Sequence, residues 1–279
     1  MSSDAAPPGI DRAPLGHATG YPDTYDPSQL FAVARAPQRA ALGIADGLPF
    51  TGRDLWTAYE LTWLDARGKP VVAIATLEFS AESPALVESK SMKLYLGSFA
   101  QSAFASAGKI VTVIERDLAA VAGAPVRVAL RSAARFPAER IVELAGDSID
   151  SLPVACDTYD VAPEYLSAAG DDVAEALTTD LFRSVCPVTG QPDIASLRIA
   201  YRGPRIDRAS LLRYLVSYRR HPGFHEHCVE RMFVDIATHC RTSALTVHAR
   251  FTRRGGIDIN PFRTDAGASV PANLRTARQ

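Results

Sequence analysis

The sequence predicts an α+β fold in which antiparallel sheets carry paired helices on one face, arranged as two successive modules. Residues 54–64 and 245–252 alternate between apolar and other side chains, which predicts strands. Residues 110–121 repeat apolar side chains at helical spacing instead. These patterns recur in each half of the chain in the order strand, strand, helix, helix, strand. Such an order is typical of helices that cover one face of an antiparallel sheet.

The first half is expected to begin with a hairpin, because two apolar strand patterns flank a short run of turn residues. Its three strands are expected at 54–64, 71–79 and 126–132. Two helical patterns are expected after residues 88–96, and the clearer one ends at Gly123 and Pro125, which stop helices.

The second half repeats this order in pattern rather than in residue identity. Its strands are expected around 157–168 and at 196–203 and 245–252, and its helices at 207–220 and 225–240. Asp207 is suited to cap the first of these helices. We therefore divide the chain into an N-terminal arm (1–50), a first module (51–150) and a second module (151–279).

Composition narrows the class of function. The chain has 279 residues, 47% of them apolar, and a net charge of -1, so a nucleic-acid partner is not expected. No apolar run reaches the ~20 residues that a membrane helix needs, and residues 1–16 do not resemble a secretion signal. Four cysteines without a CxxC pair argue against a disulfide scaffold and favour the cytoplasm. A small-molecule ligand and a second subunit are the expected partners.

The segment SVCPVTGQPD (184–193) places one cysteine among turn residues. Pro187, Gly190 and Pro192 prevent a regular element from running through it. Cys186 is then either a nucleophile whose proton is managed by Asp193 and a nearby histidine, or a small apolar residue packed under a loop. The segment alone leaves both interpretations open.

The segment FHEHC (224–228) contains residue types that bind metals, but no metal site is expected. His225 and His227 would point to nearly opposite sides of a helix, and the HExxH spacing is absent. Glu226 could instead face a pocket and accept hydrogen bonds from an N–H-rich ring, or simply favour the positive end of the helix dipole.

Two further segments combine cations with small residues. ESKSMKLYL (88–96) could bind a ligand through Glu88 and phosphate through Lys90 and Lys93, or could be a solvated helix cap. Arg253 and Arg254 precede two glycines, a pattern that suits phosphate binding or an exposed hairpin turn. Neither GxGxxG nor GxxxxGK[ST] occurs, so no Rossmann or P-loop site is expected.

Taken together, these segments resemble a known family. The residues ESKSMKLY (88–95), CPVTGQPD (186–193), FHE (224–226) and RRGGIDINP (253–261) occur in the order found in NADPH-dependent nitrile reductases of queuosine biosynthesis. Those enzymes convert 7-cyano-7-deazaguanine (preQ0) to its aminomethyl form (preQ1). The chain resembles their long, two-module form. The resemblance implies tandem tunnelling-fold (T-fold) modules that assemble into a barrel, most simply as a homodimer.

The resemblance also implies roles for individual residues. Cys186 would attack the nitrile carbon to form a covalent thioimide, Asp193 would move protons, and His225 would help hold the substrate. The implied substrate-binding residues are Val87, Glu88, Ser89, His225 and Glu226. The implied NADPH-binding residues are Ser89, Lys90, Arg254 and Gly255. A cyclohydrolase-like enzyme and a non-catalytic purine- or pterin-binding protein are the alternatives.

Overall fold

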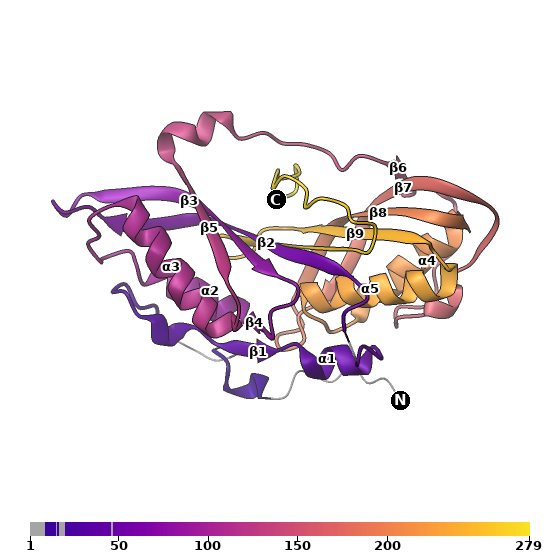
Figure 1. Cartoon of the computed structure of the whole chain (residues 1–279), viewed down its shortest axis with the longest axis horizontal. Coiled ribbons are helices and arrows are strands. Elements are labelled where there is room, and N and C mark those ends of the chain that lie inside the picture. Colours follow the sequence, from indigo (N-terminus) through magenta and orange to yellow (C-terminus); the bar gives the residue numbers. More distant parts are fainter. Residues whose placement is uncertain (1–8, 15, 17–19, 46) are drawn as a thin grey trace.

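The computed structural model describes residues 9–14, 16, 20–45 and 47–279, so parts of the predicted N-terminal arm lie outside the described residues. The described part of the arm contains only short elements. These are η1 (Ile10–Arg12), η2 (Pro27–Gln29), β1 (Ala32–Ala34) and α1 (Ala36–Ala41). β1 pairs with the short strand β4 (Ala85–Val87), and this small sheet lies beside the helices of the body (Figure 1).

An eight-stranded sheet forms the body of the molecule. Its strand order is β5 (Val126–Ser132), β3 (Pro70–Ser80), β2 (Thr51–Leu64), β10 (Ile257–Thr264), β9 (Ala244–Phe251), β8 (Pro192–Ile206), β7 (Ala168–Val185) and β6 (Asp147–Ser148). All neighbours are antiparallel except β6 and β7. The predicted α+β class with an antiparallel sheet is therefore confirmed.

The four longer helices lie on one face of this sheet, as predicted (Figure 1). They are α2 (Ser89–Gly97) and α3 (Ala107–Ala122) in the first half, and α4 (Arg208–Ser217) and α5 (His225–Cys240) in the second. Among the described residues, no helix combines the length and the apolarity needed to cross a membrane.

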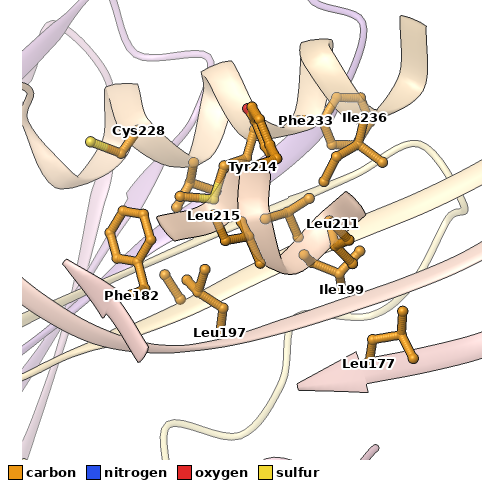
Figure 2. Close-up of a cluster of buried hydrophobic side chains, with 14 of the residues drawn as sticks. Leu177, Phe182, Leu197, Ile199, Leu211, Tyr214, Leu215, Cys228, Phe233 and Ile236 are labelled. Atoms are coloured by element: carbon orange, nitrogen blue, oxygen red, sulfur yellow. The ribbon is translucent and has the colours of Figure 1, made fainter. Parts of the chain in front are cut away.

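Each half buries its own hydrophobic cluster between helices and strands. In the first half, Leu77 of β3 packs with Met92 of α2 and Ile114 of α3. In the second half, side chains of α4 and α5 pack onto β7 and β8, as Phe233 and Leu197 illustrate (Figure 2). Burial of these apolar side chains is the main force that attaches the helices to the sheet.

Strand β10 joins the two halves into one sheet. It pairs with β2 of the first half along its whole length and with β9 of the second half over its last three residues. This strand was not predicted from the sequence. Pro261 lies within it opposite Asp54, although proline cannot donate a ladder hydrogen bond and is rarely found in central strands.

Two predicted elements of the body were wrongly placed. The opening strand of the second half is β7 (Ala168–Val185), whereas most of 157–168 is irregular and includes η4 (Pro163–Tyr165). The N-terminal part of β7 is largely exposed and polar, so its sequence shows no alternation of apolar side chains. The first long helix of the first half, α2 (Ser89–Gly97), overlaps residues 88–96 instead of following them, because Glu88 caps it, and only α3 follows that segment.

Candidate active site

The first wall of the candidate site is a corner where β4 meets the N-terminus of α2. The backbone N–H of Glu88 donates to the carbonyl of Phe31, which continues the pairing of β1 with β4. The Glu88 carboxyl group is buried and accepts hydrogen bonds from the backbone N–H groups of Lys90 (2.6 Å) and Ser91 (2.8 Å). Glu88 is thus an N-cap that satisfies two donors of the first helical turn.

The cysteine loop forms the second wall, between β7 and β8. The Cys186 N–H donates to the Gln191 carbonyl at 2.9 Å, and the Gly190 N–H donates to the Cys186 carbonyl at 3.0 Å. Gly190 has a φ of 67°, in the left-handed region that glycine adopts without strain. Cys186 is only 5% exposed and packs with a small cluster that includes Ile10 and Phe224. The thiol is therefore shielded from bulk solvent while still lining the pocket.

Asp193, at the start of β8, is the charged residue of the cysteine loop that contacts two other segments. It is buried, and its Oδ1 atom lies 2.8 Å from Nη1 of Arg254 and 3.8 Å from Nε2 of His225. Three segments distant in the sequence therefore meet at this carboxylate. The structure brings Cys186, Asp193 and His225 to one pocket, although the sequence could only suggest their chemistry one segment at a time.

The N-terminus of α5 supplies the third wall. Burial lowers the pKa of His225 to about 4, so its imidazole is neutral near pH 7. Burial, together with the nearby Asp54, raises the pKa of Glu226 to about 7. A buried, neutral imidazole next to a carboxyl group that titrates near neutrality is an arrangement found at functional sites more often than elsewhere.

One pocket is lined by side chains from all three walls. Its residues are Val33, Trp56, Leu86, Val87, Glu88, Ser89, Cys186, Pro187, Asp193, Phe224, His225, Glu226, Arg254 and Ile259. Apolar side chains and a few convergent polar groups are what a site for a small, flat, polar ligand needs.

A second pocket adjoins the first and shares Ser89, Asp193, His225, Arg254 and Ile259 with it. Lys93 lines this pocket, and its pKa is lowered by burial and then by the nearby Arg254. Two cations held close together at a partly buried position favour an anionic ligand such as a phosphate.

Two predicted cofactor residues line neither of these pockets. Lys90 and Gly255 are absent from both linings. Gly255 nevertheless adjoins the second pocket, because a Cβ atom at this position would lie 3.0 Å from Cδ of Lys93. Its φ of 60° also favours glycine. Among the described residues, no three His, Cys, Asp or Glu side chains are grouped so as to hold a metal ion.

Known proteins similar to this chain point to one family. Residues 21–130 match a family model described as nitrile reductase, 7-cyano-7-deazaguanine-reductase N-term, and residues 192–269 match one described as QueF-like protein. A relative from Bordetella pertussis, named NADPH-dependent 7-cyano-7-deazaguanine reductase, is 56% identical over 97% of this chain and 99% of its own length. A Burkholderia vietnamiensis protein of the same name is 55% identical over 96% of this chain and 99% of its own length. The chain belongs to the 7-cyano-7-deazaguanine reductase family.

One solved structure, described as the archaeosine synthase QueF-Like in the apo form, is 14% identical. It covers 36% of this chain and 99% of that chain, with a TM-score of 0.31. This score is too low to support a conclusion about the fold.

Membership of the reductase family does not by itself identify every residue of the pocket. Trp56 and Ile259 line it from β2 and β10, where sequence analysis expected core residues or a turn. The sequence offered both Lys90 and Lys93 for phosphate binding, and Lys90 was the one assigned to the cofactor. The helical spacing between Ser89 and Lys93 is the signal that could have favoured Lys93.

Proposed function

We propose that this member of the reductase family converts preQ0 to preQ1, in the queuosine pathway, at the expense of two NADPH. The reaction adds two hydrides and two protons to a nitrile and yields a primary amine. The observation that carries the proposal is the convergence of Cys186, Asp193, His225 and Glu226 on one pocket. The whole-length similarity to proteins named for this reaction supports it.

Cys186 would begin the reaction as a nucleophile. Its sulfur forms a bond to the nitrile carbon, one C–N π bond breaks, and the nitrogen takes up the proton that the thiol has lost. The product is a thioimide. When bound, NADPH supplies one hydride to the thioimide carbon and a second NADPH supplies one to the imine carbon. Between these two reductions the C–S bond breaks and Cys186 regains its electron pair.

Asp193 would carry protons between the sulfur and the substrate nitrogen. It lines the same pocket as Cys186, and its ion pair with Arg254 holds it in place. His225 is neutral near pH 7 because burial lowers its pKa to about 4, so we assign it hydrogen bonding rather than proton donation. Its ring packs edge-on against Phe251, with ring centroids 3.9 Å apart, and this contact would hold it against the substrate.

Glu226 would bind the ring of preQ0. An ionised carboxylate has two acceptor oxygens, which match adjacent N–H donors on one edge of a deazaguanine ring. Val87, Glu88 and Ser89 would lie against the same ring. Burial of the pocket would keep water from hydrolysing the imine.

The chemistry of the second pocket fits the phosphates of NADPH. Ser89, Lys90, Arg254 and Gly255 are the residues proposed from the sequence, and we add Lys93 because it lines this pocket beside Arg254. Arg254 would then contact both Asp193 and a phosphate, so cofactor binding and proton transfer would share one guanidinium group.

The proposal extends to the assembly of the protein. We propose that the two modules are T-fold modules and that two copies of the chain, in the cytoplasm, complete a barrel. The open sheet, with β5 at one edge and β6 at the other, and with its four longer helices on one face, supports this arrangement. Light scattering coupled to size exclusion should then give twice the mass of the 30.0 kDa chain.

The decisive experiment is a titration with preQ0, followed by addition of NADPH. The wild type should develop a thioimide absorbance with preQ0 alone and should then oxidise two NADPH per preQ0. Cys186→Ala should bind preQ0 but show neither signal. Cys156→Ala is the matched control, because Cys156 is another free thiol that does not line the pocket. A wild type that oxidises no NADPH in the presence of preQ0 would contradict the proposal.

A further inference from the structure

A cluster of buried ion pairs lies next to the pocket, where the two halves and the N-terminal arm meet. It consists of Arg35 and Arg39 from the arm, Asp54 of β2, Glu230 of α5 and Arg263 of β10. All five residues are buried. Buried ions need well-placed partners to offset the loss of hydration, so the geometry of this cluster is strongly constrained.

Arg263 is the central member of the cluster. Its guanidinium group lies 2.8 Å from an oxygen of Asp54 and 2.8 Å from an oxygen of Glu230. Arg35 pairs with Asp54 at 2.5 Å, and Arg39 pairs with Glu230 at 2.7 Å. Each carboxylate is therefore shared by two guanidinium groups at close range.

The cluster carries an excess positive charge. It contains three arginines and two carboxylates, so one guanidinium charge is not balanced within it. Uncompensated charge in a buried region is costly and favours a nearby group that can become an anion.

Glu226 is the nearby group that can supply the balancing charge. It lies one helical turn before Glu230 on α5, so both side chains project from the same face of the helix. Glu226 is 3% exposed and lines the pocket. Its carboxyl group interacts with its own backbone N–H and lines the pocket, where a ligand can reach it.

We infer that Asp54, Arg35 and Arg263 are positioning residues that set the ionisation of Glu226 and thereby couple ring binding to pH. Only the carboxylate form presents two acceptors to a ring edge that carries two N–H donors, since a protonated acid would direct its own O–H at a donor. The identity of the ring rests on the proposed function, whereas the control of Glu226 by the cluster does not.

The nearby charges change the pKa of Glu226 in opposite directions. Burial is the largest cause of the raised pKa. Among the charges, Asp54 raises this pKa, while Arg35 and Arg263 lower it. The other charged or titratable groups around Glu226 belong to its own helix, the arm or the pocket. They are His227, Cys228, Glu230, Arg39, Glu88, Cys186, Asp193, His225 and Arg254. A variant that removes one charge of the cluster should move the titration of Glu226 in a direction set by the sign of that charge.

The test measures Glu226 directly in the ligand-free protein. Infrared difference spectra between acid and alkaline samples report protonated carboxyl groups, and subtraction of the Glu226→Gln spectrum isolates Glu226. Asp54→Asn should lower the pH at which Glu226 is half protonated, and Arg35→Gln should raise it, each by about one unit or more. Thermal unfolding of each variant checks that it is folded.

A second measurement follows the affinity for preQ0 as a function of pH. The Kd should increase as the pH falls through the Glu226 titration, and its midpoint should move with the infrared midpoint in both variants. Shifts in the same direction, or no shift, would show that the cluster only holds the structure together and would overturn the inference. If preQ0 fails to bind the wild type at any pH, the proposed function is wrong, yet the infrared result still decides the inference.

Two other variants can replace Asp54→Asn and Arg35→Gln if either of these does not fold. Glu230→Gln removes a negative charge and should lower the Glu226 midpoint, as expected for Asp54→Asn. Arg39→Gln removes a positive charge at a less buried position and should raise the midpoint by a smaller amount. Again, shifts that do not follow the sign of the charge removed would contradict the inference.

Discussion

Two buried glutamates line the same pocket, one from each half of the molecule, and they are held in different ways. Glu88 caps α2, and its oxygens accept hydrogen bonds from two backbone N–H groups. Glu226 lies in the first turn of α5, where Phe224 occupies the N-cap position and makes no side-chain cap. Both are 3% exposed or less, so burial does not distinguish them.

Glu88 and Glu226 differ in the groups that stabilise the negative charge of the carboxylate. Glu88 is stabilised by its own helix, and therefore its position is determined locally. Glu226 has no such pair of helical donors and is influenced by the charges of the buried ion cluster, and burial together with Asp54 raises its pKa to about 7. We expect Glu88 to contribute mainly to stability and pocket shape, and Glu226 mainly to ligand binding. Four predictions test this contrast, in order of decreasing effect.

The largest difference between the two glutamates is expected in their effect on the affinity for preQ0. Glu226→Gln should weaken preQ0 binding about 100-fold, or about 3 kcal/mol, because one N–H donor of the ring is left facing another donor in a buried site. Isothermal titration calorimetry at pH 8 measures this directly. An affinity within about threefold of the wild type would exclude Glu226 as the group that binds the ring.

The free energy of unfolding should respond in the opposite order, with the larger effect at Glu88. Glu88→Ala should lower the free energy of unfolding by about 2 kcal/mol, because a cap is lost and buried N–H groups lose their acceptors. Ser106→Ala is the matched control, since Ser106 caps α3 at an exposed position and should cost only about 0.5 kcal/mol. Urea unfolding compares the two. Equal losses would mean that the buried cap has no special importance.

The pH dependence of stability should identify Glu226. Its pKa is raised in the folded protein to about 7, so between pH 6 and 8 the folded protein holds a proton that the unfolded chain has lost. Stability therefore falls as the pH rises through this window, by about 1 kcal/mol for this group. The fall should be missing from Glu226→Gln when both proteins are unfolded in urea at pH 6 and pH 8. The same fall in both proteins would assign it to another residue.

The neighbouring His225 should show a smaller effect of opposite sign. Its pKa is lowered to about 4 in the folded protein, so below pH 6.5 the unfolded chain binds a proton that the folded protein does not. The contribution of His225 to stability therefore rises from pH 6 to 8, by somewhat less than about 1 kcal/mol, and partly offsets the fall due to Glu226. His225→Asn should lose this rise. A steeper rise in the variant would show that His225 is charged in the folded protein.

Much of the fold could be predicted from local patterns. The alternation in 54–64 and 71–79 identified β2 and β3, and residues 225–240 matched α5 from end to end. These segments have apolar residues at the period of their own secondary structure, because one face of each is buried. β7 was misplaced, since much of it is polar and exposed and so lacks this pattern.

The candidate site also has features that the sequence predicted and features that it did not. The residue types of Cys186, Asp193, His225 and Glu226, and the motifs that contain them, mark these positions as candidates for chemistry in the sequence alone. Their convergence on one pocket, and the cation pair of Lys93 and Arg254, depend on contacts between segments far apart in the sequence. The periodicity of a single segment carries no information about such contacts. The roles of these residues are proposals.

The sequence by itself determined the class of the fold, the positions of most helices and strands, and the motifs that place the chain in the reductase family. Only the tertiary structure decided that β10 joins the two halves, despite Pro261 and its polar neighbours. It also decided that Glu88 is a satisfied cap while Glu226 faces the pocket beside a buried ion cluster. The physical reason is that strand pairing and buried electrostatics depend on which distant segments meet, whereas helix and strand periodicity depends on neighbours along the chain.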